Sequence, residues 1–597
     1  MKLHHHLLRL TLLGLLGLGG TARAATTFTH DVAPIVFQHC APCHRPGQGG
    51  PFPLLTFADC RKHATDLADV TGRRFMPPWL PTGPTNEFVG DRRLTETEIA
   101  VFQAWLADGL AEGDAKDLPP LPTWPGEWQL GAPDVVAQMP AAYTLQPGGR
   151  DVYRHFALPL TQPLDRPRWI RAFEFHPGSR QVHHAFLYVG RTADIQRLDA
   201  ADPVVGFGGM DSPTEVHSPG GYFLSWQPGK RTVPLPAGMG WKLEPGMDIV
   251  MQMHLQTGGK PEAIQASVGL WFADSPATNQ PLKLGLNVYD LDLPAGQSNL
   301  VYTREFVVPA DADLLGLLPH THYLGRRIEA WAELPDQTRH DLLTIPDWDF
   351  NWQGDYRYVT PVFLPRGTKL GMKFVFDNTA ANPRNPSNPP RRVGFGMSTS
   401  DEMAEVWFQL LPRTARDRIA LDRAITTQTV RDIVIYNEVR LKANPTNAVA
   451  LVNLARAKLG LGDRPGAFQA LTNALALDPT NDEGHYYLGV IHRLEGRPGP
   501  ALEEFQRAVD ANPAHGRAHG NLGILAQEQN RPEEAAEHFT AALLADPDDN
   551  LARTSLAQIR LEQGNRPEAI SLMEEAVRRA PTDANLARQL KRLKTLR

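Results

Sequence analysis

The segment Cys40-Ala41-Pro42-Cys43-His44 holds two thiols and an imidazole at a spacing that can support redox chemistry. It is the c-type heme attachment pattern, in which two cysteines add to the vinyl groups of heme and the adjacent histidine reaches the iron. The same cysteines could instead form a redox dithiol or half of a zinc site. Zinc needs two further ligands, and the sequence has no second cysteine pair. We therefore predict heme c bound covalently by Cys40 and Cys43, with His44 on the iron.

The sixth ligand of the iron is expected downstream of this motif. Met76 stands in the segment RRFMPPW, where two prolines stiffen the loop after a thioether. Residues 25–117 resemble small c-type cytochromes, and Met76 matches the position of their axial methionine. His63 is the rival ligand. Cys60 is left over and is expected to be an unpaired, partly buried thiol.

Three later segments carry histidines that could bind a metal. They are Val182-His183-His184, Met251-Gln252-Met253-His254 and Pro319-His320-Thr321-His322. Side chains two apart on a strand face the same way, so His320 and His322 can chelate one metal. His183 and His184 would point to opposite faces of a regular strand, so both can bind one metal only at a bulge or a strand end. A lone strand histidine is more often a satisfied core residue than a ligand.

The order of these motifs is more telling than any one of them. HH is followed by QxH, then by HTH, and then by the segment Asp401-Glu402-Met403. This order resembles the type II copper monooxygenases, the family of peptidylglycine α-hydroxylating monooxygenase and dopamine β-monooxygenase. The resemblance spans about residues 131–412. It implies two copper ions, one bound by His183, His184 and His254, and the other bound by the following residues: His320, His322 and Met403.

The resemblance also implies a fold and a different role for each copper site. Each copper would sit on its own jelly-roll-like sandwich, the site with the methionine would activate dioxygen, and the all-histidine site would store and pass an electron. A soft thioether favours Cu(I), whereas imidazole suits both oxidation states. Gln252 matches the family and is expected to support the metal ligands.

The chain departs from the peptide-amidating members at three positions. Leu318 stands where they have an arginine that binds the substrate carboxylate, and Glu405 and Trp407 replace an asparagine and a tyrosine. The anion-binding set is therefore missing, and a glycine-extended peptide is a poor substrate. The disulfides of the animal enzymes are also missing, because no cysteine lies beyond residue 60.

The C-terminal part repeats with a strict period. Prolines fall every 34 residues, at 445, 479, 513, 547 and 581. Small residues recur in register with them, as at Ala467, Ala501, Ala535 and Ala569. Such small residues let two helices approach closely, and the pattern resembles the tetratricopeptide repeat, with four copies and a closing helix near 582–597. This solenoid has no chemistry of its own; it can bind a protein partner or dock onto its own chain.

Residues 1–24 have the features of a secretory leader. Lys2 and Arg9 precede a short apolar run, and Ala22-Arg23-Ala24 offers a cleavage pattern. The run is too short to span a bilayer, and no later segment is long and apolar enough. We therefore expect a periplasmic or secreted protein with no membrane span. The formal net charge of −6 argues against a nucleic-acid binder that works by bulk positive charge.

The 597 residues suggest a multidomain chain. The helical pattern of residues 25–117 includes a capping box at Thr95 and Glu98, which starts a helix that can bury Ile99, Phe102 and Leu106 along one face. This pattern gives way to short apolar stretches between turns in 131–412, whose length suits two β-sandwiches better than one. The predicted domains are 1–24, signal peptide; 25–117, small α-helical c-type cytochrome; 118–130, proline-rich linker; 131–290, N-terminal copper β-sandwich; 291–412, C-terminal copper β-sandwich; and 440–597, α-helical tetratricopeptide solenoid.

Two functions from different classes fit these motifs best. The first is a copper-dependent monooxygenase that hydroxylates a C–H bond of a small-molecule or peptide substrate with dioxygen. Its electrons would come from an external donor and pass through the heme. The second is a non-catalytic heme and copper electron-transfer protein, or a copper-binding protein, scaffolded by the repeats. A third reading is an exported assembly protein with relic sandwiches, which the six filled ligand positions disfavour.

Overall fold

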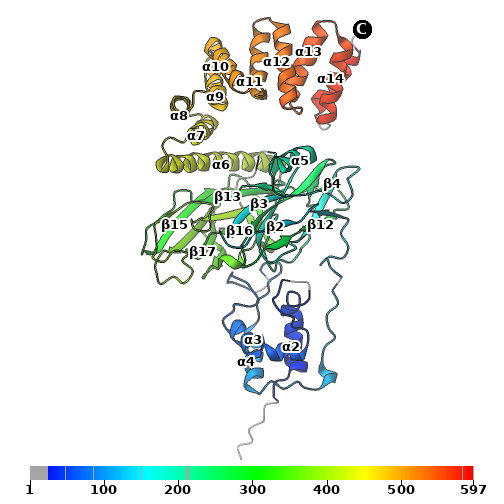
Figure 1. The fold of residues 1–597 in the computed structure, drawn as a ribbon, viewed down its shortest axis with the longest axis vertical. Helices are drawn as coiled ribbons and strands as arrows, with labels where there is room; N and C mark the ends of the chain where they lie inside the picture. The colour runs from blue at the N-terminus through cyan, green and yellow to red at the C-terminus, as the bar shows by residue number, and fades with distance from the viewer. Residues whose placement is uncertain are drawn as a thin grey trace, which may run out of the picture. The chain divides into compact units, whose positions relative to one another are not determined.

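The chain divides into two compact units. Their helices and strands are labelled in Figure 1. The computed structural model describes residues 25–46, 49–84, 87–124, 126–149, 151–209, 213, 215–580 and 583–595. The predicted leader, 1–24, lies outside these residues. The first unit consists of Met1–Pro219, Leu224–Asn279 and Asn351–Val359, and the second consists of Gly220–Phe223, Gln280–Phe350 and Thr360–Arg597.

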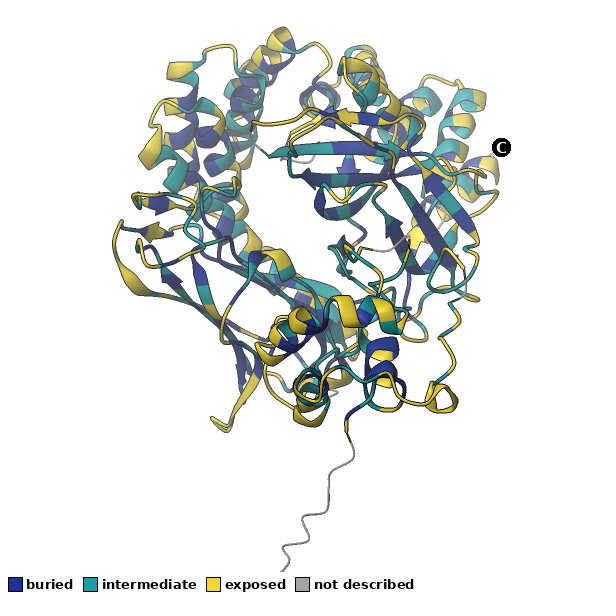
Figure 2. Cartoon of the chain, turned by 60° about the horizontal axis from the view of Figure 1, so that its bottom comes forward, coloured by how far each residue is buried: buried dark blue, intermediate teal, exposed yellow. Residues whose placement is uncertain are grey.

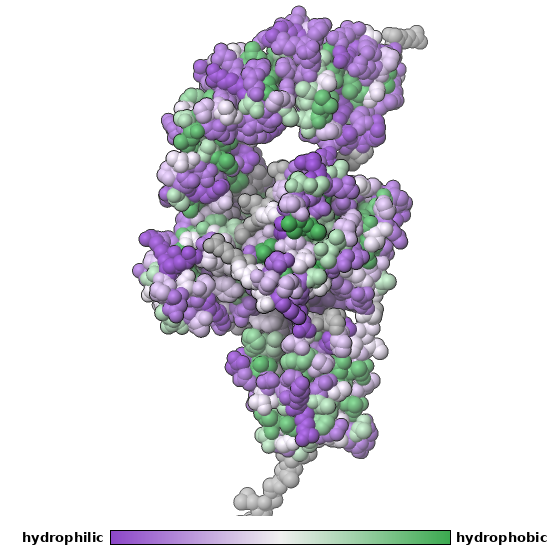
Figure 3. Space-filling model, viewed as in Figure 1, coloured by the Kyte–Doolittle hydropathy of each residue, from purple (hydrophilic) through white to green (hydrophobic). Residues whose placement is uncertain are grey.

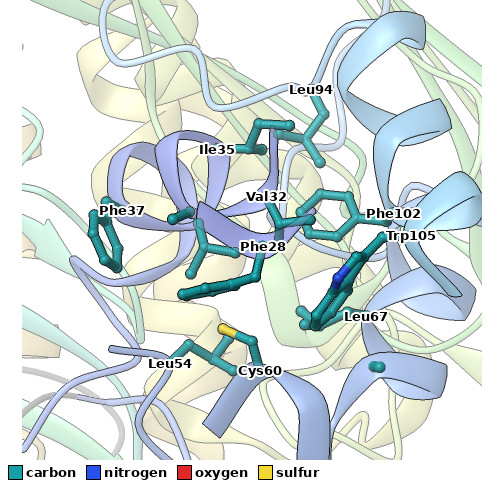
Figure 4. Packing of buried hydrophobic residues seen from close by; sticks show 13 residues of the cluster. Phe28, Val32, Ile35, Phe37, Leu54, Cys60, Leu67, Leu94, Phe102 and Trp105 are labelled. Carbon is teal, nitrogen blue, oxygen red and sulfur yellow. The ribbon is translucent and has the colours of Figure 1, made fainter. Parts of the chain in front are cut away.

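The first unit begins with short helices around one small core. They are η1 (Phe28–Val32), α1 (Ala33–Ile35), η2 (Val36–Cys40), α2 (Phe57–Lys62), α3 (Ala64–Gly72), α4 (Glu96–Ala107) and η3 (Ala115–Asp117). Helix α4 starts with the predicted capping box of Thr95 and Glu98, in which each side chain accepts a backbone N–H of the other residue. Phe28, Phe102 and Trp105 meet in the core (Figure 4). The sequence pattern predicted Phe102 on the buried face and missed Trp105.

The rest of the first unit is β-rich, as predicted. Its strands are β1 (Val135–Gln138), β2 (Tyr143–Leu145), β3 (Val152–Leu158), β4 (Arg168–His176), β5 (Val182–Arg191), β6 (Phe207–Gly208), β7 (Val216–His217), β8 (Ser225–Trp226), β9 (Trp241–Leu243), β10 (Met247–Leu255), β11 (Glu262–Ile264) and β12 (Ser267–Phe272), with α5 (Thr192–Ala201) between β5 and β6. One sheet has the order β1-β12-β4-β9. A second has β6-β3-β10-β5-β7, with β8 also on β5, and β11 pairs with β2. Strand β10 is therefore central and is paired on both sides.

The second unit contains two four-stranded sheets. Its strands are β13 (Leu282–Asn287), β14 (Asp292–Leu293), β15 (Ser298–Val307), β16 (Ala312–His320), β17 (Gly325–Glu333), β18 (Arg339–Ile345), β20 (Lys369–Asp377), β21 (Val393–Gly394), β22 (Glu405–Pro412) and the second part of β19 (Tyr356–Leu364). The first part of β19, up to Val359, and most of η4 (Phe350–Trp352) belong to the first unit. The sheets have the orders β13-β22-β16-β19 and β15-β20-β17-β18. Buried residues concentrate along the strands (Figure 2). Because β13 pairs with β22, the break between the β regions falls at Asn279/Gln280 rather than at the predicted 290/291.

A solenoid of helices ends the chain. It comprises α7 (Ala448–Gly460), α8 (Arg464–Leu477), α9 (Asp482–Leu494), α10 (Pro498–Ala511), α11 (Gly516–Glu528), α12 (Pro532–Ala545), α13 (Asn550–Glu562), α14 (Arg566–Arg579) and α15 (Ala584–Thr595). A Cβ on Gly489 would lie 2.8 Å from the Phe505 ring, and one on Gly523 would lie 2.8 Å from Phe539. The small residues are therefore required where an aromatic ring of the next helix packs against the backbone. The visible outer surface of these helices is mostly hydrophilic (Figure 3).

The solenoid is joined to the second unit's β-structure by one long helix, α6 (Ala415–Ala443), across the predicted gap 413–439. The Asn287 amide donates to Asp432 at 3.4 Å, and the Tyr436 ring lies 5.4 Å from Tyr289 and 5.8 Å from Phe395. Burial raises the pKa of Asp432 to about 6. Helix α6 therefore belongs to the packing of the β-structure along its second half. In the described part of the chain, no helix has the length and apolar character needed to cross a bilayer.

This packing predicts where the repeats can be removed. A chain that ends at residue 446 keeps all of α6, whereas one that ends at 430 loses Asp432 and Tyr436. Each aromatic pair contributes about 0.5–1.5 kcal/mol, so the shorter chain should be less stable by about 1–3 kcal/mol. Urea unfolding of the two truncated chains measures the difference, and Tyr436→Ala in the longer chain should reproduce most of it. Equal free energies of unfolding would contradict the role assigned to α6.

Candidate functional site

Three histidines of the first unit converge at an irregularity in its central sheet. Strand β10 pairs antiparallel with β5, and His254 lies opposite His184. The next pair along is Leu255 and Val182, so His183 is an extra residue in β5 and forms a β-bulge. The bulge satisfies the condition under which adjacent histidines can share one metal. One nitrogen of each of the three imidazoles lies within 4.8 Å of the others.

The residues around this cluster orient the His254 ring. Only 1% of the His254 surface is exposed, and its Nε2 lies 2.7 Å from the carboxylate of Asp151. Its Nδ1 is buried and has no hydrogen-bond partner among the described residues. A carboxylate that holds one ring nitrogen fixes the tautomer and presents the other as a ligand. The ring of Tyr153 stacks on His254 at 4.3 Å and holds its plane. Three imidazoles fit copper, although zinc also accepts such ligands.

Gln252 contacts another buried imidazole. It lies opposite His155 on β3, and its Nε2 is 3.2 Å from Nε2 of His155. Burial lowers the pKa of His155 to about 4, so this ring is neutral at pH 7. The His155 ring stacks on Phe207 at 5.2 Å. Gln252 therefore links β10 to β3 two residues before His254, and its role in supporting a metal ligand stays a prediction.

The HTH segment of the second unit places two imidazoles side by side. His320 ends β16, and its ring centroid lies 5.2 Å from that of His322. Nδ1 of His322 lies 3.1 Å from the carbonyl oxygen of Asp401, and this contact orients the ring. The Phe350 ring meets the His322 ring edge-on, with the ring centroids 5.5 Å apart. This pair can chelate a metal and needs further ligands to hold it tightly.

The buried carboxylate of Glu402 ties the HTH segment to Met403. It accepts hydrogen bonds from the Thr321 hydroxyl at 2.8 Å, from the backbone N–H of Met403 and Leu324 at 2.8 Å each, and from the His322 backbone N–H. Burial raises the pKa of Glu402 to about 7, against the effect of these four donors. The Met403 backbone is thereby held against the HTH segment, and its side chain is buried. The assignment of its sulfur as the third ligand stays a prediction.

The predicted heme motif lies at the end of η2 and in the turn that follows. The N–H groups of Cys43 and His44 donate to the Cys40 carbonyl at 3.1 and 2.9 Å, and neither cysteine forms a disulfide. Nδ1 of His44 lies 3.1 Å from the Phe52 carbonyl, so Nε2 is the nitrogen presented to a metal. A Cβ on Gly50 would come within 2.7 Å of the Cys43 carbonyl oxygen, so only glycine fits this approach. These features fit an attached heme with an oriented axial imidazole.

Both candidates for the sixth ligand remain. His63 stacks on Phe52 at 3.8 Å, and Phe52 in turn lies 5.0 Å from the His44 ring. The backbone N–H of Met76 donates to Val70 at 3.1 Å. The remaining thiol, Cys60, has no exposed surface, and burial raises its pKa to about 12. It is more deeply buried than predicted and is an inert part of the core.

Comparisons with known proteins identify the C-terminal helices. Residues 452–518 and 521–584 match the tetratricopeptide repeat family. The solved structure of MamA is 23% identical, with a TM-score of 0.24, and the match covers 27% of this chain and 95% of that chain. TTC0263, a tetratricopeptide repeat protein of Thermus thermophilus, is 25% identical, with a TM-score of 0.23, over 27% of this chain and 89% of its own. The comparison with curated proteins finds no match. The helices of residues 448–595 are tetratricopeptide repeats, so this prediction is confirmed.

The contact of Asp151 with His254 predicts a loss of metal affinity. Asp151→Ala leaves all three imidazoles in place but removes the carboxylate that orients one of them. Loss of such a supporting group typically weakens metal binding about 10–100-fold. Competition titration with a copper chelator measures the change. Asp165→Ala removes an acid that is 77% exposed and is the matched control. Equal affinities for Asp151→Ala and the parent would mean that the carboxylate does not support a metal ligand.

The two candidate sixth ligands of the heme can be separated by substitution. A thioether ligand raises the reduction potential, so Met76→Ala should lower the midpoint potential of the heme if Met76 binds the iron. His63→Ala should then leave the potential and the visible spectrum nearly unchanged. Spectroelectrochemical titration of both variants gives the answer. A changed spectrum in His63→Ala alone would assign the ligand to His63.

Proposed function

We propose that the chain is an exported copper type II monooxygenase that hydroxylates a C–H bond with dioxygen. The observation that carries the proposal is the convergence of His183, His184 and His254 at a bulge, with a carboxylate behind one of them. The HTH and DEM segments add a second set of ligand types, in the order found in that family. Together these motifs supply every ligand position that a two-copper oxygenase requires.

The side chains around each candidate site have distinct tasks. When bound, the copper ions would supply dioxygen activation and electron storage, and a covalent heme would supply electrons one at a time. Glu402 keeps the HTH segment and the Met403 backbone in one fixed arrangement, because its oxygens accept from both. Phe350 packs edge-on against His322 and helps to hold its ring in place. Asp151 keeps His254 in the tautomer whose Nδ1 can bind a metal.

The charge near His320 bears on the substrate. Glu405 lies opposite His320 in the register of β16 and β22, and Trp407 lies opposite Leu318. Burial raises the pKa of Glu405 to about 7, so this carboxyl group, which accepts a hydrogen bond from Nε1 of Trp407 at 3.2 Å, is only partly ionised at pH 7. An anionic substrate would be repelled there whenever this carboxyl is ionised. A neutral or cationic small molecule or peptide is therefore the substrate class that fits.

The proposal implies two kinds of partner besides the substrate. An external electron donor must reduce the heme, and a protein partner is expected on the tetratricopeptide repeats. Repeat solenoids of this kind present extended concave surfaces to other proteins. The sequence features of residues 1–24 favour encounters in the periplasm or outside the cell.

A second function is favoured by one specific feature. The histidine cluster of the first unit is complete without any other site, and it corresponds to the electron-storing copper of the family. A heme and such a copper ion suffice for a non-catalytic electron-transfer or copper-binding protein scaffolded by the repeats. The two functions differ in whether His320, His322 and Met403 support turnover.

Substitutions at the second site distinguish the two functions. Met403→His keeps three ligands but replaces a soft sulfur by a harder nitrogen, so the protein should still bind two copper ions while oxygen uptake falls steeply. His320→Ala should lose one copper ion, because two ligands hold the metal weakly. Elemental analysis and oxygen uptake by the reduced protein, with candidate substrates, measure both effects. His340→Ala, at an exposed position on β18, is the control.

The outcomes for Met403 decide the assignment of the oxygen-activating site. If Met403→His, Met403→Ala and the parent bind copper and consume oxygen alike, Met403 is a core methionine rather than a ligand. The electron-transfer function would then replace the monooxygenase. No oxygen uptake by any variant, with two copper ions bound and reduced, would point the same way.

A further inference from the structure

A buried amide oxygen of the second unit has no hydrogen-bond partner. Strand β13 ends at Asn287, of which 7% is exposed, and its Oδ1 is buried and accepts no hydrogen bond from any described residue. A buried polar atom without a partner is costly, so it indicates a group that the polypeptide itself does not provide. An amide oxygen can accept a hydrogen bond or bind a cation.

Two carboxyl groups lie next to this amide. Glu405 is the residue directly opposite Asn287 in the pairing of β13 and β22, so the two side chains leave the same face of the sheet with their Cβ atoms about 4.5–5.5 Å apart. Helix α6 packs on both strands and runs beside β13 (Figure 1). Its Asp432 places Oδ2 3.4 Å from Nδ2 of Asn287. The amide therefore contacts an acid of the helix and neighbours an acid of the sheet.

The chain supplies little positive charge to these two acids. Glu405 accepts from Nε1 of Trp407 at 3.2 Å, and Oδ1 of Asp432 accepts from Nε2 of Gln428 at 2.9 Å. Both donors are neutral. Among the described residues, the cation that acts on Asp432 is Arg304, which is itself bound to another acid. Burial raises the pKa of Asp432 to about 6, and the charges of the two acids repel each other. A bound cation would remove this repulsion.

The contact between Asn287 and Asp432 has the length expected for two ligands of one cation. At 3.4 Å it is long for a hydrogen bond from an amide to a carboxylate. A half-turn of the amide about its terminal bond exchanges nitrogen and oxygen and brings Oδ1 to the carboxylate. Oxygen ligands about 2.4 Å from a calcium ion lie about 3.4 Å apart when they subtend a right angle, whereas ligands about 2.1 Å from magnesium lie about 3.0 Å apart.

We propose that Asn287, Glu405 and Asp432 form a calcium site between α6 and the sheet edge at β13 and β22. Amide and carboxylate oxygens are the ligands that calcium prefers, and water completes its six to eight positions. Trp407 and Gln428 orient the two carboxylates, because each donates to one of their oxygens. Bound calcium fastens α6 to the β-structure. The site shares no ligand with the candidate copper sites and does not depend on the proposed function.

The test is isothermal titration calorimetry of the full-length protein with calcium chloride and, separately, with magnesium chloride. The parent should bind one calcium ion with a dissociation constant of about 0.1–1 mM, and magnesium more weakly. Asp432→Asn keeps the shape of the side chain but removes its charge, so calcium affinity should fall about tenfold or more. Asp422→Asn removes an exposed acid from the same helix and is the matched control, which should bind calcium like the parent.

Asn287→Asp separates a cation site from a simple hydrogen bond. A third carboxylate should tighten calcium binding about tenfold, because affinity rises with the charge of the ligands. It should also lower the melting temperature of the calcium-free protein, since three acids then repel one another, and calcium should restore it. If Asn287 only donates a hydrogen bond to Asp432, the variant is destabilised and calcium does not restore it. Thermal denaturation with and without calcium chloride measures the difference.

Three results would overturn the inference. The first is a parent protein that binds no calcium at millimolar concentrations. The second is an equal loss of calcium affinity in Asp432→Asn and Asp422→Asn, which would mean that exposed acids bind the ion in general. The third is equal affinity of the parent for calcium and magnesium, because the spacing of the ligands favours the larger ion. Copper content and oxygen uptake are separate readouts, so each of these results leaves the proposed function standing.

Discussion

A single extra residue in strand β5 brings His183 and His184 to the same side of the sheet as His254. In a regular strand His183 and His184 would face opposite sides of the sheet, and one of them would be lost to any shared metal. The bulge beside His254 turns both toward it. Strand β10 is paired on both sides, so the histidine that it contributes is held by two ladders of backbone hydrogen bonds. The arrangement of the three histidines therefore depends on the bulge in the β5/β10 pairing, while β10 is held in regular pairing with β3 on its other side.

Carboxylates orient the side chains of both candidate sites. Glu402 has no exposed surface, and burying a charge is costly unless hydrogen bonds compensate for it. Four donors offset part of that cost: the Thr321 hydroxyl and the backbone N–H groups of residues 322, 324 and 403. Their hydrogen bonds to one side chain hold the HTH segment against the Met403 backbone. Asp151 acts on His254 in the same way from outside the cluster. In both places the residue that sets the geometry is an acid next to the imidazoles rather than an imidazole itself.

The sequence predicted the features that depend on periodicity and spacing. A 34-residue period defines the repeats, and the capping box at Thr95 marks the start of α4, because both are local patterns. The bulge at His183 could be stated only as a condition, since its position depends on how β5 pairs with a strand more than sixty residues away. The partnership of Asp151 with His254 was not visible for the same reason. The boundary at Asn279 was missed because β13 is assigned by its partner β22 and not by its own composition.

Helix α6 joins the repeats to the β-structure that carries candidate metal ligands. Each repeat of the solenoid is stabilised mainly by its contacts with the adjacent repeats, so the solenoid does not depend on the candidate metal ligands. These ligands all precede residue 404. Strand β13 ends at Asn287, and Tyr289 follows it. Without a helix packed on them, these two side chains would lose their contacts with α6. Asp432 and Tyr436 supply these contacts from the second half of α6. Because α6 is one continuous helix, the residues that cover the sheet also fix the direction in which the first repeat leaves it.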